Sequence, residues 1–329
     1  MKAAIVGASG FLGKALTRHL RRCGWDVLGY DLAPPVGQAA GLPAQVAGLP
    51  RQRLDPEGQA SGLPYESLDV LGDEVSFPRG TEAVYYLAQS PRYHEFPQAA
   101  EHLFGVNTLG AIKAARAAWS AGVRAMCYAS SGNVYAPSFG PLAETSPLRR
   151  DEPYALSKLA AEEALRLFDP WISVVAVRLF GLFGPGQVRM LPPRLLARIF
   201  AGEEIVLEPA PGDAGQTEGL TVSFTFVDDA ASILERLVRR ALAGTALPPA
   251  INVAGPEPIS VRRFAEEIGR TVGIAPRLVR GETPRRGDLI ADVSLLHSLV
   301  RPQYTPFPEA VAQTCKPVSS AMGGPDPCR

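Results

Sequence analysis

GASGFLG, residues 7–13, follows a short apolar run at 3–6 and leads into a helical pattern of apolar residues. A glycine-rich turn between a strand and a helix lets a dinucleotide pyrophosphate approach the backbone, and free amides at the helix N-terminus attract the phosphates. Gly7 permits the tight turn, Gly10 the approach of the pyrophosphate, and Gly13 the close packing of helix on strand. The stretch therefore predicts a dinucleotide site at the first βα turn of a parallel sheet.

Asp31 ends the second predicted strand, 25–30, roughly 20 residues beyond the glycine turn. An acid at this position binds the adenosine ribose hydroxyls and repels a 2′-phosphate. No arginine follows directly to attract a phosphate, so the sequence favours NAD over NADP. A carboxylate close to Pro34 and Pro35 is also typical of a turn cap, and this alternative stays open.

Strand-like and helical segments alternate along the rest of the first half of the chain, which predicts an α/β fold with a parallel sheet. Further strands are expected at 65–68, 83–87, 123–129 and 171–178, and helices at 11–23, 99–121 and 154–168. The pattern then becomes mixed, with helices expected at 189–201, 229–243 and 260–272.

We therefore predict a Rossmann-type doubly wound parallel sheet with a smaller mixed α/β substrate-binding lid. The NAD-binding domain is expected over 1–180, with 227–255 returning to it, and the lid over 181–226 and 256–315. The stretch 32–63 is rich in Pro, Gly, Ala and Gln and is expected to be an irregular excursion. The tail, 316–329, has few large apolar side chains and is expected to be disordered.

The composition narrows the kinds of partner. Acidic and basic residues balance at 33 each, so no strong field favours nucleic acid or a membrane surface. No apolar stretch approaches membrane-spanning length and no signal peptide is evident, so we expect a cytoplasmic protein with a small-molecule substrate. The four cysteines form no CxxC pair and the four histidines show no ligand spacing, so no disulfide framework and no metal are expected.

Tyr154 and Lys158 lie four residues apart on a predicted helix, so their side chains share one face. An ammonium beside a tyrosine favours the phenolate, which can then act as a base, and the ammonium can also hold a nicotinamide ribose. Ser131 follows the strand expected at 123–129, at the carboxyl edge of the sheet, where its hydroxyl can bind a reacting oxygen. Asn107 could order a water or the lysine, although a polar residue inside a helix is the equal alternative.

Taken together, the motifs resemble those of the extended short-chain dehydrogenase/reductases of the NAD-dependent epimerase/dehydratase family, with the UDP-galactose 4-epimerases as the nearest type. Besides the glycine turn and Asp31, the motifs that carry the resemblance are LDV at 68–70, YLAQ at 86–89, NTLG at 107–110, SSGNVY at 130–135, YALSK at 154–158, RLFGLFGPG at 178–186, FVDD at 226–229, INVAG at 251–255 and RRGD at 285–288. The resemblance extends over nearly the whole chain to about residue 312.

The resemblance implies that Asp69 and Val70 contact adenine, that 87–89 line the pyrophosphate and ribose, and that Phe180 lies against the nicotinamide. It assigns the catalytic roles to Ser131, Tyr154 and Lys158. The residues expected to contact NAD are Gly7, Ser9, Gly10, Phe11, Leu12, Gly13, Asp31, Asp69, Val70, Leu87, Ala88, Gln89, Asn107, Tyr154, Lys158 and Phe180. It also implies a homodimer joined through the helices at 103–121 and 154–168.

Departures from the family pattern bear on the substrate. Dehydratases carry Thr-Asp-Glu where this chain has 131–133, Ser-Gly-Asn, which disfavours dehydration. Nucleotide-sugar enzymes commonly have an Asn at the position of Gly181 and an Arg near Val222, and both hold the substrate diphosphate. Arg285 remains as a diphosphate ligand because a guanidinium suits phosphate oxygens, with a structural salt bridge as the equal alternative. Ser131 and Arg285 are thus the expected substrate-binding residues.

The first functional hypothesis is a nucleotide-sugar 4-epimerase, an isomerase that uses Ser131, Tyr154 and Lys158 for transient oxidation of a secondary alcohol while NAD stays bound. The alternative is an NAD(P)-dependent dehydrogenase or ketoreductase of a sugar or another secondary alcohol, which need not be nucleotide-linked. A third is a non-catalytic NAD-binding regulator, against which the complete Ser-Tyr-Lys set argues.

Overall fold

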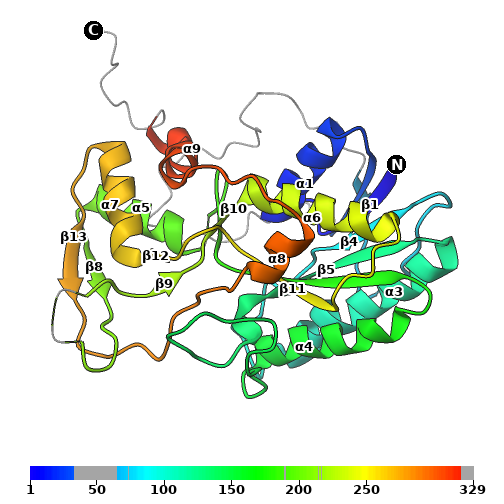
Figure 1. The fold of residues 1–329 in the computed structure, drawn as a ribbon, viewed down its shortest axis with the longest axis horizontal. Helices are drawn as coiled ribbons and strands as arrows, with labels where there is room; N and C mark the ends of the chain where they lie inside the picture. Colours follow the sequence, from blue (N-terminus) through cyan, green and yellow to red (C-terminus); the bar gives the residue numbers. More distant parts are fainter. Residues whose placement is uncertain (33–64, 73, 189, 214, 216, 320–329) are drawn as a thin grey trace, which may run out of the picture.

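A parallel sheet of seven strands forms the centre of the part of the chain that the structure describes (Figure 1). The structure is a computed structural model that describes residues 1–32, 65–72, 74–188, 190–213, 215 and 217–319. In spatial order the strands are β11 (Ala250–Val253), β6 (Ser173–Leu179), β5 (Ala125–Ser131), β4 (Ala83–Tyr86), β1 (Lys2–Val6), β2 (Asp26–Asp31) and β3 (Tyr65–Ser67). The strand order reverses beside β1, so the glycine turn lies where a doubly wound sheet binds its ligand.

Helices cover both faces of this sheet, as a doubly wound fold requires. On one face α1 (Phe11–Arg22) and α6 (Val227–Leu242) share an apolar cluster with β1 and β5. The other face is covered by α2 (Ala100–Phe104), the π-helical turn η2 (Gly105–Leu109), α3 (Gly110–Ala121) and α4 (Pro153–Leu165), which continues into η4 (Arg166–Phe168). The predicted Rossmann-type sheet is confirmed.

A second, smaller part is built around an aromatic core. Phe183, Phe224, Phe226, Phe264 and Phe307 pack edge to face with ring centroids 4.8–6.2 Å apart. Its strands pair as β8 (Glu204–Leu207) with β13 (Arg277–Arg280), β9 (Thr221–Val222) with β12 (Ile259–Ser260), and β7 (Leu182–Phe183) with β10 (Thr225–Phe226). Its helices are α5 (Leu191–Ala201), α7 (Val261–Val272) and α9 (Phe307–Ser319), while α8 (Ser294–Leu299) packs beside β11.

Two expectations about local structure need correction. The helix expected at 99–121 is interrupted by the π-helical turn η2, for which the apolar spacing carries no signal. The disordered tail was expected to begin at residue 316, but α9 continues to residue 319, because Val311 and Cys315 are buried in the smaller core and anchor the helix. Residues 320–329, and most of the excursion expected at 32–63, lie outside the described residues.

Within the described ranges, no helix has the length and apolar character needed to cross a membrane.

Candidate active site

The glycine turn between β1 and α1 is shaped by the absence of side chains. A Cβ at Gly13 would lie 2.2 Å from the Gly7 carbonyl oxygen and 2.7 Å from that of Ala8, so α1 could not pack against the turn. Gly7 has φ of 91°, and a Cβ there would lie 2.7 Å from the Ala88 amide nitrogen. Among the described residues, no side chain caps the N-terminus of α1 at Gly10. The uncovered helix terminus and the narrow glycine cradle fit the pyrophosphate of a dinucleotide.

Asp31, the last residue of β2, lies against the same turn. One carboxylate oxygen, Oδ2, accepts hydrogen bonds from the Ser9 amide at 2.8 Å and the Ser9 hydroxyl at 2.6 Å. The other, Oδ1, accepts the Leu32 amide at 2.9 Å. These bonds hold a negative charge at the edge where the adenosine ribose of a dinucleotide would lie.

The loops after β3 and β4 complete this edge of the sheet. Asp69 accepts the Leu71 amide at 2.9 Å, and Val70 is buried. Lys113 of α3 donates to the carbonyl oxygens of Val70 and Leu71 at 2.9 and 3.0 Å and so fixes the loop. Residues 87–89 follow β4 directly. Lys113 was not predicted from the sequence, because its partners are backbone oxygens in a distant segment of the chain.

Ser131, Tyr154 and Lys158 meet at the carboxyl end of β5. Ser131 is the last residue of that strand, and its side chain forms a hydrogen bond with the hydroxyl of Tyr154. Lys158 is 1% exposed, donates to the Ala129 carbonyl oxygen at 2.8 Å, and lies 5.9 Å from the centre of the Tyr154 ring. Burial raises the pKa of Tyr154 to about 12, an effect that Ser131 opposes. Burial lowers the pKa of Lys158 to about 7. Burial thus disfavours both the phenolate of Tyr154 and the ammonium of Lys158.

The hydroxyl of Tyr154 has further neighbours that the sequence did not predict. It donates to Gln89 Oε1 at 3.0 Å, which joins α4 to the loop after β4. The ring of Tyr93 lies 5.3 Å from that of Tyr154. Glu152 caps α4 by accepting the amides of Tyr154 and Ala155 at 3.2 and 2.7 Å. Tyr93 belongs to a segment without periodic pattern, so nothing in the sequence pointed to it.

Asn107 is fully buried in the π-helical turn, and both ends of its amide are engaged. Its Oδ1 accepts the Ser90 amide at 2.9 Å, and its Nδ2 donates to the Ser157 hydroxyl at 3.0 Å. Asn107 therefore links the loop after β4 to the residue that precedes Lys158. The lysine itself is held by the Ala129 carbonyl oxygen.

Two further predicted residues, Phe180 and Arg285, contact other parts of the protein closely. The Phe180 side chain is fully buried, and a Cβ at Gly132 would lie 2.9 Å from its ring. Arg285 forms the salt bridge that the sequence left open: Nε and Nη2 donate to the Asp288 carboxylate at 2.8 and 3.1 Å. A third donor, Nη1, binds the Glu208 carbonyl oxygen at 3.0 Å.

Gly181 is crowded at the position where the family pattern has an asparagine. It has φ of 38°, and a Cβ there would lie 2.6 Å from Val222 and 2.9 Å from Phe224. A larger side chain at this position would therefore displace the aromatic core of the smaller part.

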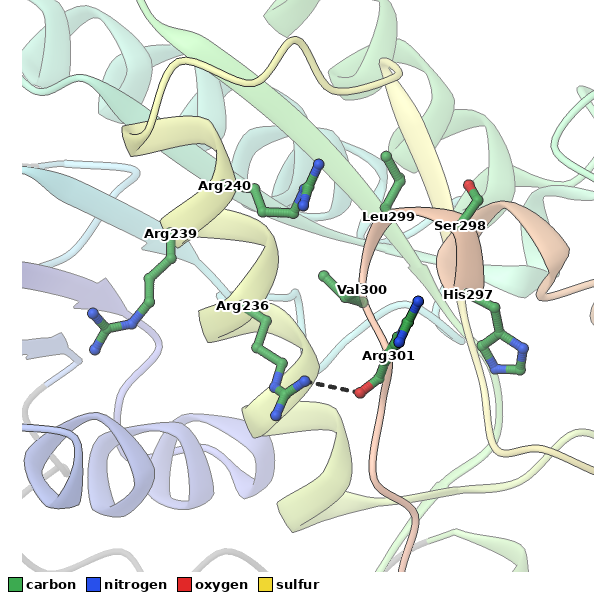
Figure 2. A pocket seen from close by; sticks show the side chains of 8 residues that line it. All are labelled: Arg236, Arg239, Arg240, His297, Ser298, Leu299, Val300 and Arg301. Atoms are coloured by element: carbon green, nitrogen blue, oxygen red, sulfur yellow. Dashed lines mark hydrogen bonds between the residues drawn. The ribbon is translucent and has the colours of Figure 1, made fainter.

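An arginine-rich cavity of about 640 Å³ is lined by none of the predicted site residues, and Figure 2 shows the side chains that line it. It is lined by the C-terminal half of α6 and the end of α8, and Arg236 donates across it to the Arg301 carbonyl oxygen at 2.8 Å. No group of three or more His, Cys, Asp or Glu side chains that could hold a metal ion occurs among the described residues.

Comparison with known proteins gives consistent relationships. The model of the NAD dependent epimerase/dehydratase family matches residues 3–254. The chain is 28% identical over 293 residues to a 2-alkyl-3-oxoalkanoate reductase of Stenotrophomonas maltophilia (strain K279a), covering 84% of this chain and 77% of the relative. It is 26% identical over 310 residues to a UDP-glucose 4-epimerase of Mycolicibacterium smegmatis, covering 88% of each.

Solved structures share the fold. The Thermus thermophilus UDP-glucose 4-epimerase in complex with NAD is 25% identical, with a TM-score of 0.70 over 96% of this chain and 98% of that one. The Bacillus cereus UDP-glucuronic acid 4-epimerase in complex with NAD is 20% identical, with a TM-score of 0.78 over 99% of both chains.

Proposed function

The chain belongs to the NAD dependent epimerase/dehydratase family, and on that basis we propose that it is a nucleotide-sugar 4-epimerase that transiently oxidises a secondary alcohol. It is an NAD-dependent enzyme of the extended short-chain dehydrogenase/reductase type, as the resemblance of its motifs predicted. The observation that carries the proposal is the meeting of Ser131, Tyr154 and Lys158 at the carboxyl end of β5, on the sheet edge that also holds the glycine turn. The relatives of known substrate include a UDP-glucose 4-epimerase.

The side chains divide the chemistry between them. Tyr154 takes the proton of the substrate hydroxyl, and the Ser131 hydroxyl donates to the same oxygen. Because burial disfavours either charge alone, a phenolate on Tyr154 and an ammonium on Lys158 stabilise each other. When bound, NAD would supply reversible hydride transfer at the alcohol carbon, and delivery of the hydride to the other face of the resulting carbonyl would invert that carbon. Gln89 accepts a hydrogen bond from the tyrosine hydroxyl in the resting arrangement and so fixes its direction.

The same edge of the sheet supplies the residues that would hold NAD. The cradle of Gly7, Gly10 and Gly13 would receive the pyrophosphate, since no described side chain caps the α1 N-terminus. Asp31 would bind the adenosine ribose and Lys158 the nicotinamide ribose.

The test is the change Tyr154→Phe, assayed by interconversion of UDP-glucose and UDP-galactose. Removing the hydroxyl deletes the proton acceptor, so turnover should fall by about 10²–10⁴-fold while NAD affinity stays within a few-fold. Tyr93→Phe is the matched control, because that ring lies 5.3 Å from the Tyr154 ring and its hydroxyl is given no part in the proposed proton transfer. Turnover by Tyr154→Phe within tenfold of the unchanged chain would remove the assignment.

A second candidate, an NAD(P)-dependent dehydrogenase or ketoreductase of a substrate without a nucleotide, is favoured by two observations. Arg285 is neutralised by Asp288, and the space at Gly181 is filled by Val222 and Phe224, so both diphosphate positions are engaged with protein. One relative is an oxoalkanoate reductase. Mass spectrometry and absorbance of gently purified protein distinguish the two: stoichiometric NAD supports an epimerase, whose cycle regenerates it, and an empty site that binds NAD reversibly supports net oxidation or reduction.

A further inference from the structure

Glu162 lies on the face of α4 that carries Tyr154 and Lys158, one helical turn beyond the lysine. Its carboxylate is buried and accepts two hydrogen bonds from Arg178 of β6, Nη2 to Oε2 at 2.7 Å and Nε to Oε1 at 3.1 Å. The Ser130 hydroxyl also donates to it. The helix that carries two predicted catalytic groups is therefore fixed to two strands by one carboxylate.

Three consecutive residues of β5 face this part of α4. The Ala129 carbonyl oxygen accepts a hydrogen bond from the Lys158 ammonium. The Ser130 hydroxyl donates to the Glu162 carboxylate. The Ser131 side chain forms a hydrogen bond with the Tyr154 hydroxyl. A shift of α4 along β5 would break all three contacts together. The carboxylate thus fixes the register of the helix against the strand on which the proposed chemistry depends.

Arg178 is held from its other side. Its Nη1 donates to the Tyr135 hydroxyl at 2.9 Å and to the Glu144 carbonyl oxygen at 3.2 Å. Tyr135 in turn donates to Asn252 Oδ1 of β11 at 2.6 Å. A buried ion pair of this kind contributes little net stability compared with well-packed apolar residues, because both charges lose their hydration. Fold stability alone is therefore a weak reason for two charges at this position.

The charges around Lys158 come from few groups. From α4 it is approached by the Tyr154 ring and interacts electrostatically with Glu162, and from β5 it is approached by the Tyr128 ring, 5.1 Å from the ammonium nitrogen. From β6, Arg178 is bound to the Glu162 carboxylate. Burial lowers the pKa of Lys158, and Glu162 is the group that raises it again.

We propose that Glu162 and Arg178 are a pair of positioning residues that set the charge of Lys158, with Glu162 retaining the ammonium and Arg178 limiting how strongly it does so. The inference rests on the proposed role of Lys158 toward the nicotinamide ribose. Removing Glu162 leaves Arg178 uncompensated, so the ammonium should be lost at lower pH. Removing Arg178 leaves Glu162 uncompensated, so the ammonium should persist to higher pH.

The experiment measures NADH affinity as a function of pH by fluorescence titration, in the full chain and in the variants Glu162→Gln, Arg178→Gln and their combination. The pH at which affinity falls to half its plateau should move down in Glu162→Gln and up in Arg178→Gln, each by about one unit, which corresponds to a change of about 1.4 kcal/mol in the interaction of the ammonium with its surroundings. The double variant should lie between them.

Ser130→Ala is the matched control, because it removes a hydrogen bond to Glu162 and leaves the charges of Glu162 and Arg178. In this variant the pH at which NADH affinity falls to half its plateau should stay unchanged. Midpoints that do not move, or that move in the same direction in both single variants, would overturn the proposal and leave a purely structural pair. If Glu162→Gln does not fold, Arg178→Gln decides alone: an upward shift supports the proposal and any other result refutes it. NADH binding needs no substrate, so this outcome is independent of whether the chain is an epimerase.

Discussion

Asp31 is the single carboxylate that we propose to set a preference between NAD and NADP. Its two oxygens already accept three hydrogen bonds from Ser9 and Leu32, which fix the charge beside the glycine turn. A carboxylate held in this way keeps a negative charge beside the glycine turn, where it would repel a 2′-phosphate. We therefore predict that a preference for NAD over NADP is an electrostatic property of this one residue.

The change Asp31→Asn tests this at the scale of the residue. Removing the charge removes the repulsion of a 2′-phosphate while leaving an oxygen for Ser9, so NADPH affinity relative to NADH should rise by about tenfold, the effect of about 1.4 kcal/mol. Paired fluorescence titrations with NADH and NADPH measure the ratio. Asp26→Asn, at the exposed other end of β2, is the control and should leave the ratio unchanged. Equal affinities in the unchanged chain would show that Asp31 does not face the ribose.

At the scale of the element, the π-helical turn η2 depends on two tyrosines of the sheet. A wider turn moves backbone carbonyl oxygens out of the regular helical hydrogen-bond pattern. The Tyr86 hydroxyl of β4 donates to the Val106 carbonyl oxygen at 2.6 Å, and the Tyr128 hydroxyl of β5 to that of Asn107 at 2.9 Å. The turn in turn holds the Asn107 amide against Ser157. Two strands thus determine how a helix presents a side chain to α4.

Tyr128→Phe should lower the free energy of unfolding by about 1–3 kcal/mol, because it leaves the buried carbonyl oxygen of Asn107 without that donor. Thermal and denaturant unfolding measure the loss. Tyr85→Phe is the control, on the neighbouring strand β4. The Tyr85 hydroxyl is buried and has no hydrogen-bond partner among the described residues, so its removal should be neutral or stabilising. Equal losses in the two variants would contradict a special role for the π-helical turn.

At the scale of the whole molecule, one helical layer exposes large apolar side chains. Trp119 of α3 and Trp171, in the turn between η4 and β6, are 53% and 63% exposed, with ring centroids 6.4 Å apart. Leu109 and Leu167, in the helical layer that contains α3 and α4 (Figure 1), are 58% and 74% exposed. A concentration of this kind is typical of a protein interface. It supports the homodimer that the resemblance implies, joined through these two helices.

The double change Trp119→Glu with Leu167→Glu should convert a dimer to a monomer, because two charges on each copy would be buried in the interface. Sedimentation velocity measures the mass. Val206→Glu, 53% exposed on β8 of the smaller part, is the control and should leave the dimer intact. A monomer in the unchanged chain, or a dimer that survives the double change, would refute the assignment of this face.

Several features followed from the sequence because they depend on neighbours along the chain. The glycine turn lies within seven residues, and Tyr154 and Lys158 are one helical turn apart, so local geometry alone brings their groups together. The alternation of strands and helices predicted the doubly wound sheet for the same reason. Glu162 continues the four-residue spacing of Tyr154 and Lys158, and this spacing can be read from the sequence. Nothing in the sequence indicated that Glu162 pairs with Arg178.

Other features depended on which strands become neighbours, and only the tertiary structure decided them. Arg178 meets Glu162 because β6 lies beside β5, and the hydroxyls of Tyr86 and Tyr128 reach η2 because this helical layer crosses β4 and β5. Arg285 could have faced a phosphate or Asp288, which is only three residues along the chain; in the structure it binds Asp288 and also the carbonyl oxygen of Glu208, 77 residues away. Hydrogen bonds and ion pairs between segments far apart in the chain need a fixed sheet order, which local sequence patterns do not encode.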